Sequence, residues 1–136
     1  MRSHEEFGLL LKHRPEASDF SPRQQLIWNV GQLAIELEMG GLGQFLYNIS
    51  PSASDPQSNV WSRLRDTIAS LAQIGATATA NRLAALLPLL EASASDDGTW
   101  EGFLDSRGIE LDWDKELEEY DELFELIDLH FATAPE

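Results

Sequence analysis

Apolar residues recur at every third or fourth position along most of this chain, which is the spacing of one face of an α-helix. The clearest stripe runs from Leu26 to Leu37 and predicts a helix that begins directly after Ser21. Ser21 and Gln24 have the spacing of a capping box, in which each side chain bonds the backbone N–H of the other residue. No segment shows sustained alternation of apolar and polar residues, so the pattern requires no β-strand.

Further helices follow, separated by segments rich in glycine, proline and small polar residues. Gly40 with Gly41, and later Gly75, are expected to end helices, because glycine accepts the positive φ found just beyond a helix C-terminus. Pro88 is expected to end another helix, for which Thr77 is a candidate cap. These additional helices are predicted over residues 42–47, from 61 to the stop at 75, and over 78–87, 99–106 and 114–131.

The sequence therefore predicts an all-α fold, a single compact domain of about five to seven helices. We divide the chain into an N-terminal helix and linker over residues 1–20, a helical domain over 21–131 that ends in an acidic helix, and a tail over 132–136. A chain of 136 residues of which 43% are hydrophobic is long and apolar enough to bury a substantial core.

The chain contains no cysteine, which excludes disulfides and thiolate metal sites. Near the N-terminus the only apolar run is Leu9–Leu11, which is too short for a secretory signal. No stretch approaches the roughly 18–20 apolar residues of a membrane span. We therefore expect a soluble, cytoplasmic protein.

Negative charge is concentrated in the last third of the sequence. Residues 1–90 carry eight acids and seven bases, whereas residues 91–136 carry sixteen acids against only Arg107 and Lys115. The last 46 residues thus hold −14 of the net −15. Binding to DNA, RNA or an anionic membrane usually requires a basic patch, so we expect none of these partners. The acids serve either solubility or the binding of a basic protein.

The predicted C-terminal helix separates its charges from its apolar residues. Its apolar stripe, from Trp113 to Phe131, is expected to pack on the core. Eight acids between Asp114 and Asp128 give one charge per roughly 2.6 Å of helix axis, comparable to one phosphate per about 3.4 Å along a DNA strand. We assign one face to partner binding, with the acids Asp114, Glu118, Asp121, Glu122, Glu125 and Asp128.

Enzyme motifs are missing from the sequence. The histidines His4, His13 and His130 form no HExxH or Glu-x-x-His pair, so no metal site is expected. The glycine-rich segment at 40–43 lacks the lysine of a phosphate-binding loop, and no strand precedes it. We therefore predict a protein that is not an enzyme and has no cofactor.

Two segments carry a resemblance to a known family. The sequence ELEMGGLGQFLYN at 36–48 resembles the signature EVxNGGFxQFxxN of a bacterial domain-of-unknown-function family that includes the neisserial DNA-mimic protein. LAQIGA at 71–76 is similar to a second motif of that family. The match departs at Leu37, Met39 and Leu42. The resemblance implies an all-helical fold, homodimerisation and, in the characterised member, an acidic surface that keeps a helix-turn-helix transcription factor off DNA.

The glycine-rich signature also has a structural explanation. Its two glycines let the chain leave one helix and enter the next at a sharp angle. Its amide side chains are suited to bond the backbone groups that such a junction leaves without partners. We assign this junction to Gly40, Gly41, Gln44, Phe45 and Asn48, with a ligand pocket as the alternative.

The leading hypothesis is a non-enzymatic acidic binding protein, a DNA mimic that takes part in transcription regulation by occupying the DNA-binding surface of a basic regulator. One alternative is an immunity-type inhibitor of a cationic toxin such as a nuclease. Another is a scaffold protein whose acids only confer solubility. The sequence leaves these alternatives open.

Overall fold

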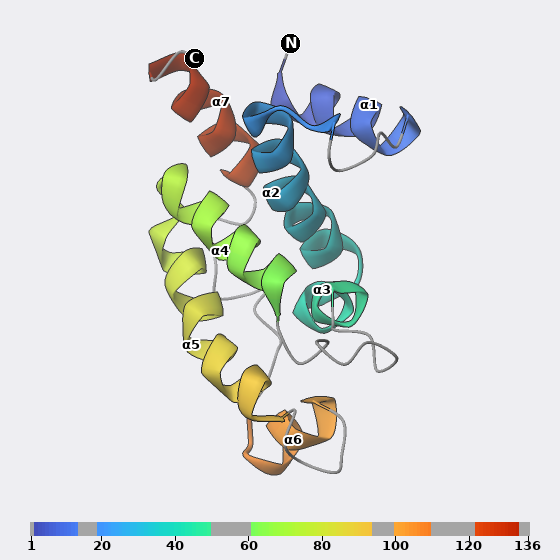
Figure 1. Ribbon diagram of the computed structural model, residues 1–136, viewed down its shortest axis with the longest axis vertical. Coiled ribbons are helices and arrows are strands. Elements are labelled where there is room, and N and C mark those ends of the chain that lie inside the picture. The colour runs from blue at the N-terminus through green and yellow to red at the C-terminus, as the bar shows by residue number, and fades with distance from the viewer. Residues whose placement is uncertain (1, 14–18, 50–60, 94–99, 110–121, 134–136) are drawn as a thin grey trace.

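The computed structural model describes residues 2–13, 19–49, 61–93, 100–109 and 122–133, and these residues form seven helices and no strand (Figure 1). This confirms the predicted all-α fold. The helices are α1 (Ser3–His13), α2 (Pro22–Met39), α3 (Gly41–Ile49), α4 (Ser62–Gln73), α5 (Thr77–Ser93), α6 (Trp100–Ser106) and α7 (Leu123–Thr133). No helix among these residues is both long and apolar enough to cross a membrane.

Helix α2 lies at the centre of the molecule and contacts α1, α3, α4 and α7. It can do so because its buried residues are not confined to one stripe: Leu26 and Ile27, and later Leu33 and Ala34, are neighbours in sequence and all buried. Helices α4 and α5 are joined by a short link and form an antiparallel hairpin, and α6 packs on α5. The first turn of α1 and the last turn of α7 lie at the opposite end of the molecule from α6 (Figure 1).

The hydrophobic core draws on all seven helices. Helix α1 belongs to it, since Phe7 and Leu10 are buried together with residues of the other helices. Trp61 is also buried and meets the half-buried Trp100 edge to face, with ring centroids 5.9 Å apart. The largest fully buried side chains are Ile27, Leu33, Leu42, Phe45, Leu46, Leu64, Leu71, Leu83, Leu90, Leu104, Leu123 and Ile127.

The capping box at the start of α2 is confirmed. The Ser21 N–H donates to Gln24 Oε1 at 2.9 Å, and the Gln24 N–H donates to Ser21 Oγ at 3.1 Å. These bonds satisfy two backbone donors that a helix N-terminus otherwise leaves free. They fix where α2 begins, and therefore where its buried residues meet the other helices.

Replacing Ser21 by alanine is expected to lower the free energy of unfolding by about 1 kcal/mol, because it removes the acceptor for the Gln24 N–H. Urea denaturation followed by circular dichroism measures this change. The matched control is Ser62→Ala at the exposed start of α4, which is expected to change stability by less than about 0.5 kcal/mol. Equal losses in the two variants would contradict the capping role.

The predicted boundaries of α5 are wrong at both ends. Thr77 is the first residue of the helix and not its cap, since the Ala80 N–H already bonds the Ala76 carbonyl at 2.9 Å. The helix continues through Pro88 to Ser93. Proline at this position removes the bond to the Ala84 carbonyl, but Pro88 and Ala84 are both exposed, where water can replace the lost donor. The buried side chains of Leu86 and Leu90, two residues away on either side of Pro88, keep the segment helical.

Candidate partner-binding surface

Helix α7 is anchored by its apolar side, as predicted. Ile127 is fully buried, and Phe124 and Phe131 are half-buried against the core. Leu123, in the first turn of α7, is also fully buried. The helix ends at Thr133, two residues beyond the predicted end. The predicted first turns of this helix, from Asp114 to Asp121, lie outside the described residues.

The acids assigned to partner binding fall into three groups. Glu122 and Glu125 are exposed. Asp128 is only half-exposed and lies against the N-terminus of α1. The other three, Asp114, Glu118 and Asp121, are outside the described residues, so the part of the acidic face that they form stays a prediction.

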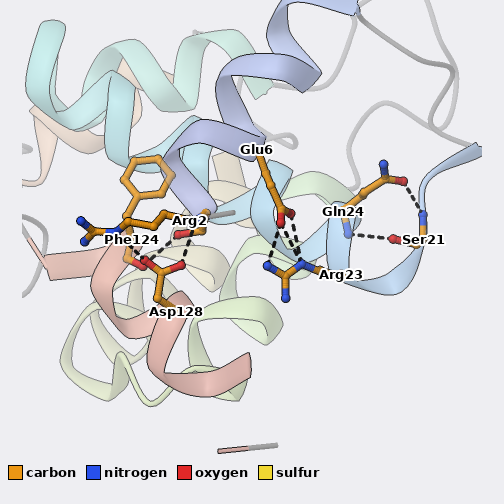
Figure 2. A network of polar contacts seen from close by, with 8 residues as sticks. Arg2, Glu6, Ser21, Arg23, Gln24, Phe124 and Asp128 are labelled. Atoms are coloured by element: carbon orange, nitrogen blue, oxygen red, sulfur yellow. Dashed lines mark hydrogen bonds and ion pairs between the residues drawn. The ribbon is translucent and has the colours of Figure 1, made fainter. Parts of the chain in front are cut away.

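Asp128 binds the N-terminus of α1 (Figure 2). Its Oδ1 accepts the N–H of Ser3 at 2.8 Å, while Ser3 Oγ donates to the Phe124 carbonyl at 2.9 Å. Arg2 Nε lies 3.7 Å from Asp128 Oδ2, which is buried and makes no hydrogen bond among the described residues. A carboxylate at a helix N-terminus satisfies a free backbone donor and interacts favourably with the helix dipole. Asp128 thus has a structural role that its own position in the sequence does not reveal.

Glu6 and Arg23 form a second link at this end of the molecule (Figure 2). Arg23 donates from Nε and Nη2 to the Glu6 carboxylate, at 2.8–3.2 Å. Its guanidinium carbon also lies 4.3 Å from the centre of the Phe131 ring. One arginine of α2 therefore ties α1 to α7. The planar guanidinium suits both contacts, since it can pair with a carboxylate edge-on and stack on an aromatic face.

A surface groove of about 770 Å³ lies between α1, α2 and α7. Arg2 and Glu5 come from the α1 end of the chain, Arg23 comes from α2, and the remaining wall belongs to α7. The groove combines both signs of charge with apolar surface. Its lining residues are Arg2, Glu5, Arg23, Glu125, Asp128, Leu129, Phe131 and Ala132.

The glycine junction joins α2 to α3. Gly41 has φ of +82°, a conformation that residues with a side chain rarely adopt. A Cβ on Gly40 would lie 2.8 Å from Gln44 Cβ, so this glycine makes room for the Gln44 side chain. Phe45 is 1% exposed and belongs to the core. The Asn48 amide donates to Glu36 Oε1 at 2.9 Å, which corrects the expected bond to a backbone group.

The junction also borders a small hollow of about 300 Å³, which the Asn48, Glu36 and Phe45 side chains line. The pair between Asn48 and Glu36 spans α3 and α2, which fits a structural role for the amide. No three histidine or carboxylate side chains come close enough to hold a metal ion within the described ranges.

These features place the protein in the class of acidic helical proteins. The chain carries a large negative charge, its C-terminal helix is held on the core by apolar residues, and a glycine junction joins two core helices. Comparison of the chain with known protein families agrees with the resemblance seen in the sequence. The family model described as "DMP19-like protein" matches residues 18–134, so the chain belongs to this family, that of the neisserial DNA mimic protein. No curated protein and no solved structure matches the chain.

Proposed function

We propose that this protein is a non-enzymatic, cytoplasmic binding protein that occupies the DNA-binding surface of a basic protein, such as a helix-turn-helix regulator, as a DNA mimic. The observation that carries the proposal is the charge distribution, with −14 of the net −15 in residues 91–136, in a chain of the DMP19-like family. In this proposal the acidic face of the C-terminal helix stands in for DNA phosphates.

The described part of the C-terminal helix supports this role. Its buried residues, Leu123 and Ile127, hold it on the core, while Glu122 and Glu125 are exposed to a partner. A fixed helix presents its carboxylates without a large entropic cost on binding. The negative electrostatic field of these carboxylates speeds the encounter with a cationic surface, and salt screens this field over about 8–10 Å at physiological ionic strength. Binding is therefore fast and sensitive to salt.

Neutralising three acids of this face, as Glu118→Gln, Asp121→Asn and Glu122→Gln together, is expected to weaken binding to the basic partner at least about tenfold. The wild-type protein is first used to capture partners from lysate of its own host, and each captured protein is tested for operator binding. Wild-type protein should release the regulator from DNA in a gel-shift assay. The measured quantity is the concentration needed for half-release, at low and at physiological salt.

The matched control neutralises three exposed acids outside the last third, as Asp19→Asn, Glu38→Gln and Asp66→Asn. Both variants change the net charge by three, so a general charge effect weakens both equally. Equal weakening, or no release of DNA by the wild-type protein, would contradict the mimic. Capture of a nuclease whose activity is blocked would instead support the immunity-type inhibitor. The homodimer implied by the resemblance is measured in the same samples by analytical ultracentrifugation.

A further inference from the structure

The groove between α1, α2 and α7 carries two carboxylates that no basic side chain within the described residues neutralises. Arg23 is paired with Glu6, and Arg2 faces Asp128. Glu5 and Glu125 line the groove, are exposed, and form no ion pair in this part of the chain. One comes from α1 and the other from α7, so the two acids belong to different helices bordering the same groove.

The same groove offers apolar surface beside these carboxylates. Leu129 is 59% exposed and is one of five large apolar side chains that are exposed among the described residues. Phe131 and Ala132 continue the apolar lining. A long basic side chain is suited to such a surface, because its aliphatic stem covers apolar groups while its charged head pairs with carboxylates. The stacking of Arg23 on Phe131 shows that this region already holds one guanidinium by the same chemistry.

Arg2 is held weakly in the groove. Its side chain is 65% exposed, and its Nε lies 3.7 Å from Asp128 Oδ2, beyond hydrogen-bond distance. That oxygen is buried beside Arg2 without a hydrogen bond from the described residues. Arg2 therefore makes no hydrogen bond to Asp128 that an incoming guanidinium would have to break. Displacement costs little, because exposed ion pairs are weak.

We propose that this groove binds an arginine side chain of the basic partner, with Glu5 and Glu125 pairing with the guanidinium and Arg2 acting as the displaceable internal competitor. The proposal rests on the proposed function and adds α1 to the partner surface. Helix α1 precedes residue 18, so Glu5 and Arg2 lie outside the residues that the family model matches. The groove would therefore contribute specificity that family membership does not describe.

The test is a titration of the full chain, isotope-labelled at leucine and alanine methyl groups, with an alanine-based helical peptide that bears arginine at every fourth position. The Leu129 and Ala132 methyl signals are expected to shift as the peptide binds. Glu5→Gln is expected to weaken binding about threefold, and Arg2→Gln to strengthen it by a similar factor. The lysine counterpart of the peptide is expected to bind more weakly, because an ammonium group lacks the planar fork of a guanidinium.

Matched variants separate the groove from general electrostatics. Glu38→Gln makes the same charge change as Glu5→Gln on an exposed residue of α2, and Lys12→Gln makes the same change as Arg2→Gln on α1. All four residues are exposed, and thermal melting checks that each variant is folded. Equal effects within each pair, or methyl shifts confined to other residues, would overturn the proposal. Equal binding of the lysine peptide would overturn the assignment to arginine.

Failure of this inference is distinguishable from failure of the proposed function. If Glu5→Gln releases a captured regulator from DNA as well as the wild-type protein does, the groove plays no part while the mimic stands. If the wild-type protein captures no DNA-binding protein, the mimic is wrong, and the peptide titration still decides whether the groove binds arginine.

Discussion

Replacing Phe7 by alanine is expected to lower the free energy of unfolding by about 3–5 kcal/mol, a loss that would consume a large part of the stability of a domain of this size. Phe7 is 3% exposed and packs where α1 crosses α2. Its ring lies 5.7 Å from the ring of Trp28 and 5.9 Å from that of Phe124, measured between centroids. Alanine would leave a cavity at the contact of three helices, which the surrounding side chains fill only in part.

Chemical denaturation measures this loss, and the exposed Leu9 on the same helix provides the control. Leu9 is 43% exposed, so Leu9→Ala is expected to cost less than about 1 kcal/mol. Similar losses for the two variants would contradict the packing of α1 seen in the structure. Helix α1 would then be a dispensable extension and not part of the core.

Gly31 approaches the same contact from the other side. A Cβ added to Gly31 would clash with the Phe7 ring, so that ring would have to shift from its packed position. Overpacking of this kind costs about 1–3 kcal/mol, against a gain of up to about 1 kcal/mol in helix propensity for alanine over glycine. We expect Gly31→Ala to destabilise the wild-type protein but to have little further effect beside Phe7→Ala, because the clash is then removed.

Local sequence rules predicted those parts of the fold that depend on neighbours in the chain. The capping box at Ser21 and Gln24 is confirmed, and Gly75 has the positive φ expected beyond a helix end. The rule failed at Pro88, because burial of Leu86 and Leu90 keeps α5 helical through it. Helix ends are decided partly by packing, which spacing along the chain does not report.

The candidate site depends more strongly on contacts between distant residues. Spacing along the C-terminal helix places Asp128 on the same face as Glu125, and nothing local separates their roles. The structure separates them, because the N-terminus of α1 meets Asp128 across 125 residues of sequence. The same holds for Glu6 and Arg23, whose pairing needs α1 to lie beside α2. Periodicity predicts which face of a helix is polar, but only the tertiary fold shows which charges are already paired.

Gly31 illustrates the same limit for the core. A glycine in the middle of a helix lowers helix propensity, and the sequence alone gives no reason for it. The structure supplies the reason, since the absent side chain is what lets Phe7 approach α2. A glycine inside an otherwise strong helical pattern could therefore have indicated that another segment packs closely against this helix.

Replacing Asp128 by alanine is expected to lower the free energy of unfolding by about 2 kcal/mol, although the residue lies on the predicted partner face. The substitution removes the acceptor of the Ser3 N–H, and Ser3 is fully buried, so water cannot easily replace it. A buried donor left without an acceptor costs about 1–3 kcal/mol. Asp128→Asn keeps an oxygen for this bond and loses the charge, so about half of the loss is expected.

The control for this prediction is Glu125→Gln, one turn earlier on the same helix and exposed. This substitution is expected to change the free energy of unfolding by less than about 0.5 kcal/mol. Native-state hydrogen exchange locates the effect, because Asp128→Ala should speed exchange throughout α1 while leaving the α4–α5 hairpin protected. If Asp128→Ala instead left stability and α1 unchanged but weakened partner binding as much as Glu125→Gln, Asp128 would belong to the mimic surface after all. The contrast between the two residues therefore tests which acids of α7 hold the fold together and which are left to meet a partner.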